Sequence, residues 1–85
     1  QDLYPSPNPS KDFVRVDLSP YELGAGCNLR VVDASSRVVW SQPVGGSVAA
    51  GPVEVPLHGI SAGFYAIQVL NPQGQRLATG RLIKE

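Results

Sequence analysis

The residue types of a thiol-dependent enzyme all occur in this chain, as Cys27, His58 and Asp33. A cysteine nucleophile needs a base within hydrogen-bonding reach and a third group that orients the base. Cys27 alternates with Leu29 in an apolar stretch, which predicts a thiol that points into the core, whereas His58 precedes a glycine in a predicted loop. We therefore expect a buried, inert thiol and a solvated imidazole, and no catalytic residue.

Other sites that bind cofactors or metals have no clear counterpart in the sequence. One cysteine and one histidine cannot complete a tetrahedral zinc site, and the patterns of calcium loops, phosphate loops and nucleophilic serine turns are absent. The glycine-rich stretch 44–51 lacks the lysine and the helix of a phosphate loop, so we expect a flexible connection. No spacing singles out a catalytic pair of carboxylates among Asp12, Asp17 and Glu22, so we expect these side chains to be solvated. The sequence thus predicts neither a cofactor nor a metal.

Three aromatic residues, Tyr4, Tyr21 and Trp40, are the remaining side chains that could hold a ligand. A row of exposed rings can bind a sugar, because each ring offers a flat apolar face. On a small β domain such residues more often lie half-buried against the core. We expect packing of that kind here.

Size and charge narrow the range of functions. The chain has 85 residues, enough for one domain, and 42% of them are hydrophobic, as in a globular core. Seven basic and seven acidic residues give a net charge of zero, so we expect no nucleic acid partner. No apolar run approaches the roughly 20 residues of a membrane helix, and no signal peptide is recognisable, so we expect no membrane insertion. A single cysteine excludes an internal disulfide, and a chain that begins with Gln1 is expected to be part of a longer protein.

Alternation of apolar and polar residues predicts β-strands along most of the chain. From Asp12 the residues Val14, Val16 and Leu18 share one face, and the same period returns between residues 27 and 43 on both sides of a turn. Further strands are expected at 53–57, 64–70 and 76–85, separated by turns rich in Gly, Pro and Asn. We therefore predict an all-β fold, a small Ig-like β-sandwich of about six or seven mostly antiparallel strands in two packed sheets.

Two hairpins have the same turn chemistry. In "VVDASSRVV" and "VLNPQGQRLA" an apolar pair is followed by an Asx residue, a turn and a second apolar pair. An Asx side chain can accept hydrogen bonds from the backbone that follows it, which starts a tight turn. We expect structural turn roles for Asp33, Ser36, Arg37, Asn71 and Gly74. Gly80 is expected to host a β-bulge that changes which face of the last strand is turned inward.

Proline at positions 5, 7 and 9 stiffens the N-terminal segment. Each proline lacks a backbone donor and pushes the residue before it into extended geometry. We expect residues 1–9 to lie along a sheet edge or to form a stiff leader.

Four motifs in chain order resemble one known family. They are "YPSPNPSKDFVRVDL", "LRVVDASSRVVW", "VEVPLHGISAGFYAIQV" and the final "RLIKE". From about Leu3 to Glu85 the chain resembles the type A C-terminal sorting domain of the type IX (Por) secretion system of Bacteroidota. That family usually has glycine where Ser36 and Asp12 stand. The turn needs a residue with positive φ at this position, which glycine adopts more easily than serine. We therefore expect the turn at Ser36 to use another geometry or to bear strain.

The resemblance implies a single domain, residues 1–85, that directs an attached N-terminal cargo through the periplasm and across the outer membrane, to the cell surface or the medium. It also implies a translocon that reads the domain and a sortase that usually cuts near its start and joins the cargo to anionic lipopolysaccharide. On this reading residues 1–9 form an exposed boundary with the cargo, and Gln1 lies near the cut. The family contributes no catalytic residue. We also consider a dimer formed by edge-strand pairing.

The last strand is the part of the domain that we expect the translocon to read. An exposed edge offers backbone groups to which a receptor can add a strand. In this hypothesis Gly63 sets a turn, Tyr65 and Ile67 anchor the neighbouring strand in the core, and Arg81 and Lys84 point outward. The full set of expected recognition residues is Gly63, Tyr65, Gly80, Arg81, Leu82, Ile83, Lys84 and Glu85.

Two other functions are compatible with such a fold, because fold alone does not determine function. One is an accessory module of a multidomain surface protein that binds a carbohydrate or a protein, which predicts a solvent-facing aromatic strip containing Trp40. The other is a purely structural domain, which predicts tolerance of C-terminal extension. An enzyme has the least support.

Overall fold

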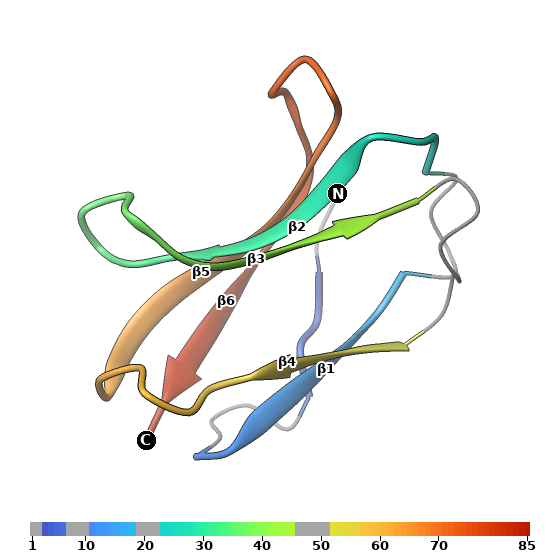
Figure 1. Cartoon of the computed structure of the whole chain (residues 1–85). Helices are drawn as coiled ribbons and strands as arrows, with labels where there is room; N and C mark the ends of the chain where they lie inside the picture. The colour runs from blue at the N-terminus through green and yellow to red at the C-terminus, as the bar shows by residue number, and fades with distance from the viewer. Residues whose placement is uncertain (1–2, 7–10, 19–22, 46–51) are drawn as a thin grey trace.

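The computed structural model of the chain describes residues 3–6, 11–18, 23–45 and 52–85. Six β-strands and no helix occur in these ranges (Figure 1), which confirms the all-β prediction. The predictions for Tyr21, for Glu22 and for most of the glycine-rich stretch lie outside the described residues. The strands are β1 (Phe13–Asp17), β2 (Cys27–Val32), β3 (Val38–Val44), β4 (Pro52–Pro56), β5 (Gly63–Leu70) and β6 (Arg76–Lys84).

The strands form two antiparallel sheets, as predicted. β1 pairs with β4, and the other four strands form a sheet in the order β3-β2-β5-β6. In Figure 1 the β1–β4 pair lies across from the larger sheet, an arrangement consistent with a small Ig-like sandwich. Pro52 and Pro56 are tolerated at the ends of β4 because both members of a two-stranded sheet are edges.

The core lies between the two sheets and follows the alternation in the sequence. Val14 and Val16 of β1 are buried against the inner face of the four-stranded sheet, which is the face turned toward β1 and β4. The opposite face is called the outer face below. The other buried members of the core are Leu3, Leu18, Cys27, Leu29, Val31, Val44, Val55, Leu57, Ile67, Val69, Ala78 and Leu82.

The N-terminal residues 3–6 join the two sheets at one side of the sandwich. The Leu3 N–H donates to the Thr79 carbonyl oxygen of β6 at 2.7 Å, and Ser6 exchanges two backbone hydrogen bonds with Arg15 of β1, at 2.8 and 2.9 Å. Leu3 and Pro5 are buried. This part of the leader therefore lies along the edge of β6, as the first of the two alternatives predicted. Tyr4 and Ser6 are exposed, so the expectation of an exposed leader is wrong only for Leu3 and Pro5.

Gly80 does not host a bulge, which contradicts the prediction. It stands opposite Ile67 in regular register, and the irregularity in β6 lies instead at Leu77, between the pairs Leu70↔Arg76 and Val69↔Ala78. The backbone of Leu3 passes directly over Gly80, where an added Cβ would collide with the Leu3 carbonyl oxygen. Glycine is therefore required at this position by the close approach of the leader.

Candidate recognition surface

The thiol, imidazole and carboxylate weighed above as a catalytic set are not assembled. Cys27 is buried at the start of β2, and Asp33 follows the end of the same strand, so the two are separated by roughly 20 Å of extended chain. His58 is exposed in the turn after β4. Within the described ranges no three His, Cys, Asp or Glu side chains gather as a metal site would require. The same ranges contain no helix that could cross a membrane.

The three aromatic residues Tyr4, Tyr21 and Trp40 were all expected to be half-buried against the core, and the structure confirms this for one of the two that it describes. Trp40 stands beside Val31 on the inner face, half-buried against the core, as predicted. Tyr4 instead has an exposed fraction of 79%. The two rings lie at opposite edges of the four-stranded sheet, because Trp40 belongs to β3 and Tyr4 runs beside β6. These two rings cannot form one solvent-facing aromatic strip, which is the feature expected of a sugar-binding module.

The predicted turn residues form two hairpin loops of the same geometry, the first at residues 33–37 and the second at 71–75. In the first, the Asp33 Oδ1 accepts hydrogen bonds from the N–H groups of Ser35 and Arg37, at 2.9 and 3.0 Å. In the second, the Asn71 Oδ1 accepts them from Gln73 and Gln75, at 3.0 and 2.9 Å. The repeated turn chemistry is therefore the structural feature that the sequence indicated.

Both loops place their fourth residue in the left-handed region of φ. Gly74 adopts this conformation without a steric penalty at φ 85°, whereas Ser36 adopts it at φ 65°. Ser36 thus bears the strain that the sequence anticipated, on the order of 1 kcal/mol. An extra residue follows each loop in the next strand, Val39 in β3 and Leu77 in β6, and these two bulges were not anticipated.

The Asp33 carboxylate differs from Asn71 in its ability to titrate. Its pKa lies below the ordinary value of 3.8, chiefly because the Arg37 backbone N–H donates to the charged form. The Ser35 N–H and the Arg37 guanidinium, whose Nε lies 3.1 Å from Oδ2, lower this pKa further, while partial desolvation opposes them. The charged form is therefore the one that holds the loop together.

We expect the first loop, and not the second, to open in acid. A depressed folded-state pKa contributes stability at pH values above 3.8, and this contribution is lost as the pH falls through the lower folded-state value. In an NMR titration the amide signals of Ser35 and Arg37 should shift below pH 3.8. Those of Gln73 and Gln75 should not, because Asn71 carries no charge. The variant Asp33→Asn is the control, and it should abolish the shift. Equal responses of the two loops would contradict this account.

The structure brings most of the expected recognition residues together at one end of the β5–β6 hairpin. β6 is an edge strand, and it pairs with β5 through Gly63↔Lys84, Tyr65↔Leu82 and Ala66↔Arg81. We call residues 63–65 and 81–85 the open end of this hairpin. Gly80 is separate from it, because it lies under the leader.

The side chains at the open end have different environments. Leu82 is fully buried, Ile83 is half-buried, and Arg81 and Glu85 are exposed. Lys84 was expected to point outward, but it lies on the same side of the strand as Leu82 and is half-buried, with its Nζ donating to the Glu85 carbonyl oxygen at 2.8 Å. Arg81 is therefore the exposed cation of this end of β6.

The neighbouring strand supports the open end from the core side. Gly63 has φ 151°, a value that favours glycine. The Tyr65 hydroxyl donates to the Ser61 carbonyl oxygen, and its ring packs against the core in register with Leu82. Ile67 is fully buried. Tyr65 and Ile67 thus anchor β5 as expected.

Phe64 is an exposed residue at the open end that the sequence analysis did not single out. Its exposed fraction is 74%, the largest of any apolar residue in β5 and β6. It stands opposite Ile83, and a pocket of about 350 Å³ lies between these two residues, Arg81 and the Tyr65–Leu82 pair. Alternation with the inward residues Tyr65 and Ile67 is the signal that could have identified Phe64 as outward-facing.

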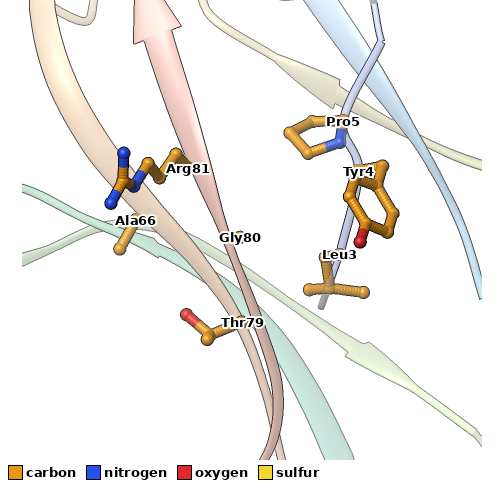
Figure 2. A pocket seen from close by; sticks show the side chains of 7 residues that line it. All are labelled: Leu3, Tyr4, Pro5, Ala66, Thr79, Gly80 and Arg81. Atoms are coloured by element: carbon orange, nitrogen blue, oxygen red, sulfur yellow. The ribbon is translucent and has the colours of Figure 1, made fainter. Parts of the chain in front are cut away.

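A second pocket, of about 570 Å³, lies where the leader runs beside β6 (Figure 2). Leu3, Tyr4 and Pro5 line it from the leader, and Ala66, Thr79, Gly80 and Arg81 line it from β5 and β6. Arg81 borders both pockets, so the exposed cation lies between the leader and the open end.

Comparison with known families gives one result. The sequence matches the family described as "Secretion system C-terminal sorting domain" over residues 3–85. This range includes all the described strands, both hairpin loops and the leader residues that cross between the sheets. A comparison with curated proteins finds no significant match.

Proposed function

Because the chain belongs to the secretion system C-terminal sorting domain family, we propose that the translocon of the type IX system reads it at the open end of the β5–β6 hairpin. The family is that of C-terminal sorting signals of type IX secretion, so the domain marks an attached cargo for transport to the outer membrane surface or beyond. The observation that supports the proposed site is the exposed apolar ring of Phe64 next to the cation of Arg81 on an edge hairpin. Aromatic and arginine side chains are the residues that most often dominate protein interfaces.

Export of a reporter fused to the chain tests this site. We expect Phe64→Ser to lower secretion in a type IX-competent bacterium on the order of tenfold, because it removes an interface anchor. The free energy of unfolding should change by only about 0.5 kcal/mol, since the ring is mostly solvated.

Leu77→Ser is the matched control for this experiment. Leu77 is also an exposed apolar residue of the hairpin, with an exposed fraction of 39%, and it lies outside the open end. Its replacement should leave export unchanged. Equal export of the Phe64→Ser and Leu77→Ser fusions would reject the proposed site.

We further propose that the cargo is released by a sortase and joined to anionic lipopolysaccharide, and that the cut lies before Leu3. A protease needs an extended substrate without competing hydrogen bonds, whereas Leu3 and Ser6 are bonded to β6 and β1. Transit through the periplasm belongs to the same proposal. Mass spectrometry of the released domain should find its first residue at or before Leu3, and any first residue after Leu3 would exclude this placement.

A further inference from the structure

The outer face of the four-stranded sheet is partly buried, although β1 and β4 lie on the other side. Val32, Gln68 and Leu70 have exposed fractions of only 4%, 8% and 7%. In Figure 1 the two hairpin loops project from different ends of this sheet, away from β1 and β4. A pocket of about 280 Å³ is lined both by Ser36 of the first loop and by Gly74 of the second. The outer face is therefore a groove framed by the two loops.

One of the two arginines in this groove is held in place by a buried amide. The Arg30 Nε donates to the Gln68 Oε1 at 3.0 Å, and Gln68 is the buried polar residue on the floor. Within the described part of the chain the terminal amino groups of Arg30 make no further hydrogen bond. Arg30 is half-buried, so its guanidinium is oriented and has donors left for a ligand.

The second arginine reaches the groove because of the bulge at Leu77. Strict alternation from Ala78, which is buried on the inner face, would turn Arg76 inward as well. The extra residue instead sets Arg76 beside Leu70 on the outer face. Arg76 lines the same pocket as Arg30, and its side chain makes no ion pair or hydrogen bond within the described residues.

The charge of the surrounding sheet has one sign. The sequences of β2, β3, β5 and β6 contain four basic residues and no acidic one, although the chain as a whole is neutral. The acidic strand residues Asp17 and Glu54 lie in the other sheet. Arg30 and Arg76 are the basic residues that line the groove, and the carboxylate of Asp33 in the first loop is already paired with Arg37 at 3.1 Å. The groove is thus complementary to a negatively charged group, and arginine donors are well suited to a carboxylate.

The groove also has apolar surface next to its charge. A neighbouring pocket of about 340 Å³ shares Arg30, Leu70 and Gly74. It is lined further by the exposed apolar side chains of Val38 and Pro72 and by the polar residues Asn28, Ser41 and Asn71. A bare inorganic anion would leave Val38 and Pro72 uncovered, whereas a peptide can cover them with its own apolar residues. We propose that this groove binds an extended segment of a partner protein in which a glutamate or aspartate, flanked by apolar residues, pairs with Arg30 and Arg76. The inference goes beyond the proposed export role and does not depend on it.

Titration of the purified chain with a defined peptide tests this proposal. The probe is the blocked peptide acetyl-Ser-Leu-Glu-Leu-Ser-amide, followed by NMR. Saturable shifts are expected for the amide signals of Arg30, Gln68 and Gly74. The variant Arg76→Gln, whose side chain is exposed and outside the core, should weaken binding about tenfold, because it removes one charged hydrogen-bonding partner. Arg15→Gln loses the same charge on β1 and should bind as tightly as the parent chain.

Each alternative result has a definite meaning. Absence of a saturable shift up to about 1 mM peptide would overturn the proposal. Equal weakening by Arg15→Gln and Arg76→Gln would show general electrostatic attraction instead of a site. If a peptide with Gln in place of Glu binds equally well, the carboxylate does not contribute to binding, and the proposed pairing with Arg30 and Arg76 is wrong. Inorganic phosphate that binds as tightly as the peptide would make the groove a small-anion site. A failed export assay at the open end would leave this binding measurement unaffected.

Discussion

Leu82→Ala is expected to lower the free energy of unfolding by about 2–5 kcal/mol. Leu82 is fully buried on the inner face of β6, in register with Tyr65, and its removal would leave a cavity in the core. A domain of this size has a total stability of roughly 4–13 kcal/mol, so this one substitution removes a large part of it. Chemical denaturation followed by tryptophan fluorescence measures the change, because Trp40 packs against the same core.

Leu77→Ala is the matched control, since it shortens the same side chain on the same strand where 39% of it is exposed. We expect it to change stability by less than about 1 kcal/mol. A loss below about 1 kcal/mol for Leu82→Ala would mean that the end of β6 is not part of the core.

This expectation changes how truncation experiments on the domain should be interpreted. Deleting residues 82–85 removes a core side chain together with the proposed recognition residues. A loss of export after such a deletion would therefore report unfolding as much as loss of a signal. Substitutions of solvent-exposed side chains, such as Phe64→Ser, separate the two effects.

Gly80→Ala is the second substitution for which we expect a large effect, a loss of about 2–3 kcal/mol. The new Cβ would lie 3.0 Å from the Leu3 Cβ and closer still to the Leu3 carbonyl oxygen, which is backbone and cannot move alone. The leader would have to leave β6, and the domain would lose the burial of Leu3 and its hydrogen bond to Thr79. Denaturant unfolding measures the loss, and faster proteolysis of residues 3–6 should accompany it.

Two comparisons identify the cause of that loss. Gly24→Ala places a Cβ where no atom lies within 4 Å, so it should be nearly neutral. In a chain that lacks residues 1–6, Gly80→Ala should cost much less than in the full chain, because the group with which it collides is gone. Equal costs in the two chains would exclude displacement of the leader as the mechanism.

The two surfaces that we propose for binding are separate. The open end consists of residues 63–65 and 81–85, whereas the groove lies between the two hairpin loops and centres on Arg30. Phe64→Ser and Arg76→Gln therefore alter different parts of the domain. A secretion assay and a binding assay on both variants can assign each surface its own role.

Local sequence patterns were sufficient to predict the strands, the hairpin turns and the family. Alternation identifies Val14, Val16, Leu29 and Val31 as inward residues, because a strand turns successive side chains to opposite faces whatever its partner is. Asp33 and Asn71 identify the hairpin loops, since an Asx turn is made by residues within five positions of each other. The four motifs pointed to the family because they depend on residue identity and order.

Contacts between distant segments set the features that the sequence analysis missed. Gly80 was predicted to host a bulge, because a bulge is one of several reasons for a glycine within a strand. The actual reason is the close approach of the leader, which lies 77 residues earlier in the chain. The bulge at Leu77 turns Arg76 outward, although strict alternation predicts the opposite. Val32, Gln68 and Leu70 are buried on the outer face, in a pocket that is also lined by Ser36 of the first loop and Gly74 of the second. A period of two residues cannot report such contacts, because they depend on which segments meet in space.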